Sequence, residues 1–335
     1  MDNVLLSVVI PTHGRPFLLE KAICSALESS IENNVEVIVV PNGEGSDWIS
    51  VSDKFSNNRK VIFLQCKEGN GNAARNVGLR AARGKYIRFL DDDDYFYSEN
   101  ASLQLREMIE SEADVSSGMI EIIDSAGLSH GLCTYPLSED FITANLKVSG
   151  ITLPTANIYK KSIINNVWDE KITRAQDYIF ILDFIIQKCN EKNIHWHRFN
   201  KAIGIWYQHN EYRVSSSHGK RSFLSWNFER VVELYYNLIE NGNLNESRKF
   251  EVSVALWRFI ENSYGLDRSL CMDYANFLFK ENLKENKIAE NLNVNKKIKC
   301  LIRKKPMYYI RVKWLFLHFF GGVRARLKSK EIIKV

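Results

Sequence analysis

The chain has 335 residues, of which 45% are apolar and 25% are charged, and its formal net charge is +5. This composition is ordinary for a soluble globular protein of one large or two medium domains, and it excludes a largely disordered chain. The six cysteines lie far apart and form no CxxC pair, which excludes the spacing of a zinc site and favours reduced, structural thiols. No basic stretch precedes the first apolar run, so we expect no secretory signal.

The N-terminal part of the chain alternates apolar runs typical of buried strands with stripes typical of helices. Strands are predicted at 5–10, 36–40, 61–66 and 86–90, and helices at 18–26 and 72–82. This alternation predicts an α/β fold with a mostly parallel central sheet and helices on both of its faces. Ligands of such sheets bind outside the carboxyl ends of the strands. Because residues 11–13, 42–43 and 91–94 each follow a predicted strand, we expect them to converge on one crevice.

Four consecutive aspartates, Asp91 to Asp94, directly follow the last of these apolar runs. Shorter runs of like charge at a strand end are usually solvated turns. Four adjacent carboxylates repel one another and favour a bound divalent cation, for which hard oxygen ligands suit Mn²⁺ or Mg²⁺. Such a cation would in turn hold a diphosphate.

Residues 69–74 match the pattern GxGxxA between a predicted strand and a predicted helix, with Asp91 further along the chain. This pattern is typical of a dinucleotide-binding site, so an NAD-dependent dehydrogenase is an alternative. Two observations weigh against it. The segment belongs to the third strand-helix unit rather than the first, and a single ribose-binding acid does not explain Asp92, Asp93 and Asp94.

A longer series of motifs runs in order from about residue 5 to residue 217. Its segments are 7–16, 36–43, 71–78 with 84–87, 89–94, 168–170 with 175–178, and 206–215. Each segment alone is a weak signal, but the ordered set is specific and resembles family 2 glycosyltransferases of the GT-A fold. The resemblance implies an inverting transferase that uses a nucleoside-diphosphate sugar, with UDP as the nucleotide that the family most often uses.

The resemblance also implies roles for single residues. The implied nucleotide-binding residues are Pro11, Thr12, Arg15, Asn42, Arg75, Asp91, Asp92 and Arg213, and the implied metal-binding residues are Asp93, Asp94 and His209. Asp91 is expected near the ribose and Asp93 on the metal, although the register of four adjacent aspartates can shift by one. Pro41 stands where the family usually has an acid. For His209 and Arg213 the alternative is an ordinary surface or core position.

The transfer itself requires a base, because the attacking hydroxyl must lose a proton. Asp177 is the candidate, at the place where the family commonly has Glu-Asp and this chain has Gln176 before the aspartate. The alternative is that Asp177 is only an acid in the first turn of a helix, where negative charge is favourable.

We expect three regions: a catalytic domain at 1–217, a helical region at 218–295 and a tail at 296–335. Residues 296–330 contain twelve Lys or Arg and no acid, so the remaining chain has a net charge of about −7. The longest uncharged run of the tail is too short to span a bilayer. Its basic and aromatic residues predict binding to an anionic membrane surface; packing on the body and nucleic-acid binding are the alternatives.

The resemblance implies a bacterial glycosyltransferase, and with the basic tail we expect it to be cytoplasmic and peripheral on the inner face of the membrane. It would move a hexose from a UDP-sugar to a lipid-linked saccharide of a surface polysaccharide such as O-antigen or capsule, with Mn²⁺ or Mg²⁺ as cofactor and no nucleic-acid partner. The change to Gln176 leaves open a non-catalytic scaffold that binds sugar nucleotides and docks through its tail.

Overall fold

The computed structural model describes residues 4–31, 34–136, 140–147, 150–165, 167–188, 194–209, 220–263 and 267–280. The chain divides into two compact units, Met1–Ser217 and His218–Val335, which are described one at a time. The predicted tail at 296–335 lies outside the described residues, as does Arg213.

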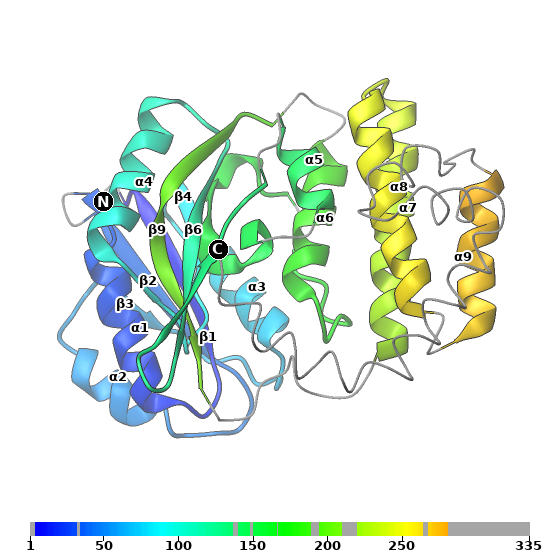
Figure 1. Ribbon diagram of the computed structural model, residues 1–335. Helices are drawn as coiled ribbons and strands as arrows, with labels where there is room; N and C mark the ends of the chain where they lie inside the picture. Colours follow the sequence, from blue (N-terminus) through cyan, green and yellow to red (C-terminus); the bar gives the residue numbers. More distant parts are fainter. Residues whose placement is uncertain are drawn as a thin grey trace. The chain divides into compact units, whose positions relative to one another are not determined.

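The first unit is built on one mixed sheet, seen in the centre of its ribbon in Figure 1. Its strands in the described residues are β1 (Leu6–Thr12), β2 (Val35–Pro41), β3 (Val61–Phe63), β4 (Tyr86–Phe89), β5 (Tyr95–Phe96), β6 (Val115–Asp124), β7 (Ser129–Cys133), β8 (Asn157–Lys160) and β9 (Trp196–Gln208). They follow the order β3-β2-β1-β4-β8-β6-β9-β5, with β7 paired to β6. Strands β1 to β4 are parallel, which confirms the parallel arrangement predicted for the N-terminal part. Strand β8 is antiparallel to β4 and β6, and β6 runs parallel to β9.

Helices cover both faces of this sheet, as the alternating pattern predicts. They are α1 (Pro16–Glu28), α2 (Ile49–Phe55), α3 (Gly71–Ala81), α4 (Ser98–Glu110), α5 (Phe141–Leu146) and α6 (Gln176–Lys188), with short 3₁₀ turns at Gly150–Thr152, Pro154–Ala156 and Lys161–Ile163. Figure 1 shows α1 and α4 on one side of the sheet and α3 and α6 on the other. Every residue of β1 and β2 is buried, because a strand covered on both faces has no side left for solvent.

Helix α3 lies against β1 at a glycine. A Cβ atom added to Gly78 would stand 2.4 Å from Cγ1 of Val9, so only a residue without a side chain allows this approach. The N-terminus of the helix is capped by Asn70, whose side chain accepts the backbone N–H groups of Asn72 and Ala73. The predicted helix at 72–82 is therefore confirmed to within one residue at each end.

The second unit contains α7 (Lys220–Glu240), α8 (Glu246–Ser263) and α9 (Arg268–Lys280) in its described part. Large apolar side chains of these helices pack in the interior: Leu234, Leu238, Trp257 and Ile260 are all buried. Of the helices that the structure describes, none combines the length and the apolar character needed to cross a bilayer.

Candidate active site

The carboxyl ends of three neighbouring strands bring the predicted residues together. In the register of the sheet Thr12 of β1 stands beside Pro41 of β2, and Val9 stands beside Phe89 of β4. The loops that follow these strands therefore leave the sheet at the same edge. Residues 12–15, 42 and 91–94 lie in these loops, as the predicted crevice requires.

Asp92 ties the aspartate loop to the end of β1. Its Oδ2 accepts the hydroxyl of Thr12 at 2.7 Å and the backbone N–H of His13 at 3.2 Å, and its Oδ1 accepts Arg15 Nη1 at 3.0 Å. Burial raises the pKa of Asp92 to about 6; Arg15 opposes this rise and Asp93 adds to it. These three bonds, together with a bond of 2.5 Å from Arg15 to Asp93, fix the shape of the loop.

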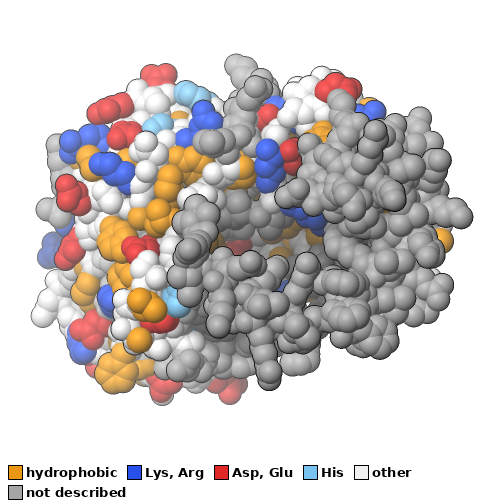
Figure 2. Space-filling model, in the orientation of Figure 1, with side chains coloured by type: hydrophobic (Ala, Val, Ile, Leu, Met, Phe, Trp, Pro, Cys, Tyr) orange, Lys and Arg blue, Asp and Glu red, His pale blue; other side chains and the backbone are white. Residues whose placement is uncertain are grey.

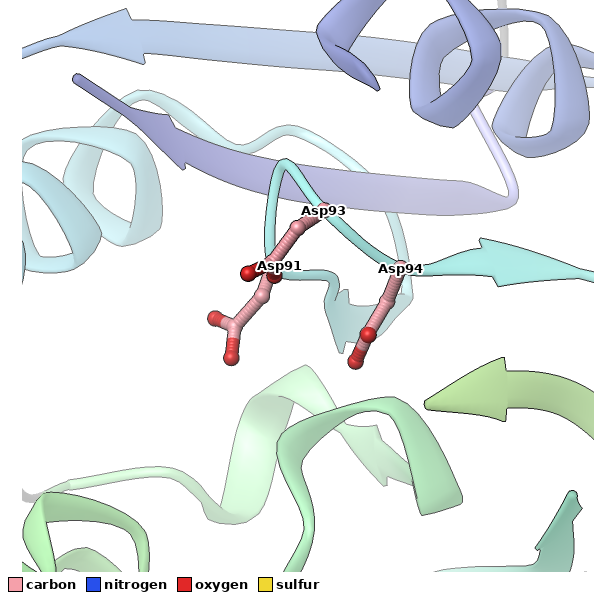
Figure 3. Close-up of side chains that lie close together, drawn as sticks. All are labelled: Asp91, Asp93 and Asp94. Carbon is pink, nitrogen blue, oxygen red and sulfur yellow. The ribbon is translucent and has the colours of Figure 1, made fainter. Parts of the chain in front are cut away.

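Three carboxylates of the loop form a group of possible metal ligands. Oxygens of Asp91, Asp93 and Asp94 all lie within 4.8 Å of one another, and Figure 3 shows the three side chains leaving one tight turn before β5. Carboxylate oxygens are the donors that Mg²⁺ and Mn²⁺ prefer, so the residues present fit such an ion. His209 is not part of this group of three, but its Nε2 lies 2.8 Å from Oδ2 of Asp93.

Asp94 accepts hydrogen bonds from two residues outside the parallel strands β1 to β4, one of them in β9. Its Oδ2 accepts the hydroxyl of Thr155 and its Oδ1 accepts the backbone N–H of Tyr207 in β9, both at 3.1 Å. Burial, with Asp93 and Asp91 close by, raises the pKa of Asp94 well above the usual range of an aspartate. A nearby positive charge would stabilise the ionised carboxylate, which agrees with a cation site.

A buried arginine joins the aspartate loop to the start of α6. Arg75 of α3 donates from Nη2 to Asp91 at 2.6 Å and from Nη1 to Oε1 of Gln176 at 3.2 Å. Burial opposes its charge, but the attraction of Asp91 and Asp177 raises the pKa of Arg75. Because the arginine offers only donors, the oxygen of the Gln176 amide must face it.

Asp177 stands in the first turn of α6, next to this arginine. Burial raises the pKa of Asp177 to about 7, with Arg75 lowering it and Asp91 raising it. Its neighbour Ala175 has a φ of 48°, a left-handed conformation that costs a non-glycine residue free energy. Asp177 is thus an acid in the first turn of a helix, which was the alternative explanation for it. It is also a carboxylate beside Arg75 with a pKa suited to a base.

A cavity opens between the loops after β1 and β2. It is lined by Thr12, His13, Gly14, Arg15, Pro16, Leu19, Pro41, Asn42, Gly45, Asp47 and Trp48. Pro11 is not among these residues and lies inside β1. Asn42 faces the cavity, but its Nδ2 donates to the carbonyl of Thr12 at 2.9 Å, so it joins the two loops.

Sequence reasoning placed His13 at the crevice with residues 11–13 but gave it no role, and it missed Asp47 and Trp48. These two residues stand in a loop with no motif of its own. The glycine pattern at 69–74 also does not form the pyrophosphate-binding site that the NAD-dependent dehydrogenase alternative requires. The first N–H groups of α3 are taken by the side chain of Asn70, so they are not available to a pyrophosphate.

The mixed sheet with helices on both faces and carboxylates at its carboxyl edge is a GT-A type fold, similar to that of S. aureus TarS 1–349 in complex with UDP-GlcNAc. That similarity has a TM-score of 0.61 and 17% sequence identity, and covers 88% of this chain and 78% of TarS 1–349. Residues 7–183, more than half of the chain, match the family model of glycosyl transferase family 2, and the chain belongs to this family. It is therefore a glycosyltransferase.

Relatives of the chain are also named as glycosyltransferases. An uncharacterized glycosyltransferase of Haemophilus influenzae is 26% identical over 249 residues, which cover 71% of this chain and 96% of that protein. The poly(ribitol-phosphate) beta-glucosyltransferase of Bacillus spizizenii is 21% identical over 258 residues, which cover 74% of this chain and 38% of that enzyme. The chain thus spans nearly all of the first relative and less than half of the second.

Proposed function

We propose that this glycosyltransferase moves one sugar, with inversion, from a UDP-hexose to a hydroxyl group of a saccharide. The observation that carries the proposal is Arg75, which donates to Asp91 of the aspartate loop and lies close enough to Asp177 for their charges to attract. The guanidinium of Arg75 thus links the aspartate loop, which is suited to the diphosphate end of a donor, to the candidate base Asp177. The UDP-GlcNAc complex of TarS and the name of the Bacillus relative support a sugar nucleotide as the donor.

The reaction assigns Asp177 the role of base. The acceptor oxygen attacks the anomeric carbon while the bond from that carbon to the β-phosphate oxygen breaks, and the electron pair leaves with the diphosphate. The hydroxyl proton passes to a carboxylate oxygen of Asp177. With a pKa of about 7, this carboxylate is ionised in much of the protein at neutral pH and still basic enough to accept the proton.

The aspartate loop faces the leaving group. A divalent cation held by Asp91, Asp93 and Asp94 would stabilise the negative charge that develops on the diphosphate. Arg15 lies beside the same loop and its guanidinium matches phosphate geometry. His209 contacts Asp93 and is proposed to orient it. Arg213 keeps its proposed role at the diphosphate and lies outside the described residues.

The cavity between the loops after β1 and β2 is proposed to hold the nucleotide base. Trp48 and His13 offer planar rings, and Asp47 offers a carboxylate that can accept an N–H group of the base. This carboxylate would take the place of the acid that Pro41 replaces. Thr12 and Asn42 shape the cavity by joining the loops.

The acceptor is proposed to be a lipid-linked saccharide in the assembly of a bacterial surface polysaccharide. The basic, aromatic tail at 296–335 supports this, because it suits an anionic membrane surface where such an acceptor sits. We propose that residues 1–217 form the catalytic domain and that the protein works on the inner face of the cytoplasmic membrane.

The test is a panel of UDP- and GDP-sugars, assayed for nucleotide release with Mn²⁺, together with calorimetric titration of UDP, GDP and NAD. We expect metal-dependent UDP binding and UDP release, and we expect Asp177→Asn to lower release at least about a hundredfold while UDP still binds. Asp53→Asn, at an exposed position of α2, is the matched control. UDP binding with no release from any sugar nucleotide would favour the scaffold instead, and full activity in Asp177→Asn would refute this base.

A further inference from the structure

Asn76 of α3 binds the loop formed by residues 168–172 with both ends of its side-chain amide. Its Oδ1 accepts the backbone N–H of Trp168 at 2.8 Å, and its Nδ2 donates to the carbonyl of Trp168, also at 2.8 Å. The same Nδ2 donates to Oε1 of Glu170 at 2.9 Å. Since only 2% of Asn76 is exposed, losing one of these bonds would leave a buried polar group unpaired.

Two more asparagines fasten the same loop. Asn72 donates from Nδ2 to the carbonyls of Asp169 and Ile172, at 2.7 and 3.1 Å. Asn70, the cap of α3, donates from Nδ2 to the carbonyl of Glu170 at 2.8 Å. The side-chain amides of α3 and its cap therefore fix the backbone of this loop. They supply hydrogen bonds to the loop carbonyls that, in a sheet, would come from a neighbouring strand.

Trp168 connects the loop to the candidate active site, because its ring contacts residues on both α6 and α3. Its ring stacks on Phe180 of α6, with centroids 4.3 Å apart and an interplanar angle of 11°, and meets the edge of Phe89 of β4 at 5.1 Å. The guanidinium carbon of Arg75 lies 4.6 Å from the centre of the same ring. The indole thus contacts both the helix that bears Asp177 and the arginine that binds Asp91.

We propose that Asn76 is a positioning residue for transfer: by holding loop 168–172, it sets where Asp177 and Arg75 stand relative to the aspartate loop. Only a short connection separates the loop from α6, so a shift of the loop displaces the first turn of the helix. This inference rests on the proposed role of Asp177 as the base. It goes beyond that role because Asn76 contacts neither a reacting atom nor Asp177.

Asparagine is suited to this position because one short side chain must both accept and donate. An aspartate is not equivalent: in Asn76→Asp the side chain keeps the acceptor for the Trp168 N–H but loses the N–H donors that bond to the Trp168 carbonyl and to Glu170. The new carboxylate would also face that of Glu170, and like charges at this distance repel. The substitution keeps the shape of the side chain and changes its bonding and its charge.

The experiment compares Asn76→Asp, Glu170→Gln and the double variant, using UDP-glucose first and then the best donor of the panel, with Mn²⁺. We expect Asn76→Asp to lower kcat about tenfold or more, with KM and UDP affinity within about twofold of wild type. Glu170→Gln alone should stay within about twofold, since a glutamine oxygen can still accept from Asn76. The double variant should recover part of the loss, because a glutamine amide at 170 removes the repulsion and can donate to the introduced carboxylate, while the Trp168 carbonyl stays without its donor.

A folded Asn76→Asp protein with the kcat of wild type would overturn the proposal, and so would a parallel loss of kcat and UDP affinity without recovery in the double variant. If Asn76→Asp does not fold, Asn70→Ser decides: serine keeps the helix cap but loses the bond to the Glu170 carbonyl. Its kcat should then fall about twofold to threefold at constant KM, and an unchanged kcat would refute the idea. Full turnover in Asp177→Asn would refute the base itself, whereas loss there with full turnover in Asn76→Asp refutes only the positioning role.

Discussion

At the scale of single residues, the main feature of the site is how the negative charges of the four aspartates are balanced. Asp91 is paired with Arg75, and Asp92 and Asp93 share Arg15. Asp94 is instead bonded to a hydroxyl and a backbone N–H, and its pKa is raised by burial. With all four carboxylates ionised, the loop would hold more negative charge than its two arginines offset, which is the electrostatic reason why a bound cation would be favourable there.

The first prediction concerns Asp94. Asp94→Asn should weaken Mn²⁺-dependent binding of UDP at least about tenfold, because it removes one of three charged donors while preserving the size of the side chain. Calorimetric titration with and without Mn²⁺ measures this, with Asp53→Asn as control. Equal metal dependence in the variant and in wild type would contradict the assignment of Asp94 to the metal.

The second prediction concerns the stability cost of Asp177. Its pKa in the folded protein, about 7, is above that of an unfolded aspartate, so the folded state holds the proton more tightly and loses stability as pH rises from about 4 to about 7. Asp177→Asn should therefore melt at higher temperature than wild type at pH 8, by about 2 °C or more, with a smaller difference at pH 5. Thermal scans without metal at both pH values test this. A difference that is the same at pH 5 and pH 8 would show that the carboxylate is not responsible.

At the scale of elements, α3 connects the aspartate loop to the loop at 168–172 that precedes α6. One of its faces packs on β1 at Gly78, its side chains hold the loop at 168–172, and Arg75 reaches the aspartate loop. A single helix thus contacts the central sheet, the loop at 168–172 and the aspartate loop. Its placement matters more than its intrinsic stability, since most helical stability in proteins comes from packing.

The third prediction follows from that packing. Gly78→Ala should destabilise the protein by about 1–3 kcal/mol, because the added methyl group would overlap Cγ1 of Val9. Denaturant unfolding measures the change. Arg80→Ala, on the exposed face of the same helix, should stay within about 0.5 kcal/mol. Adding Val9→Ala should make the double variant less destabilised than the sum of the single ones; strict additivity would argue against the overlap.

At the scale of the whole molecule, charge is divided along the chain. The twelve cations at 296–330 give the tail the sign opposite to that of the remaining chain. The described surface shows Lys, Arg, Asp and Glu interspersed with apolar side chains on the face drawn in Figure 2. A membrane interaction through electrostatics is therefore expected from the tail rather than from the described residues of this face.

The fourth prediction tests the tail in the chain of 335 residues. Replacing Arg303, Lys304 and Lys305 with Gln should weaken binding to vesicles that contain phosphatidylserine by up to about 1 kcal/mol for each charge removed. Co-sedimentation with vesicles at low and high salt measures this. The control is the triple variant Lys54→Gln, Lys67→Gln and Lys201→Gln, whose positions are exposed in the described units. Equal loss in both triple variants would mean that the tail has no special role.

Much of the fold and part of the site could be predicted because their signals are local. The buried strands β1 and β2 have continuous apolar runs, and the aspartates are adjacent in the sequence. The bonds between Asn76 and Trp168 join residues 92 positions apart, and nothing in either segment alone indicates the other. The same is true of Trp48, which lines the cavity from a loop without a motif, and of the antiparallel strand β8 beside β4.

The sequence by itself determined the parallel strands, the edge at which ligands are expected and the acidic character of that edge, because periodicity and adjacent charges act over a few residues. Only the tertiary structure decided which partner each charge has. It placed Arg75 between Asp91 and Gln176, gave Asp177 its raised pKa through burial, and used the asparagines of α3 to hold a distant loop. These properties depend on desolvation and on pairing across the chain, which exist only after the core has closed.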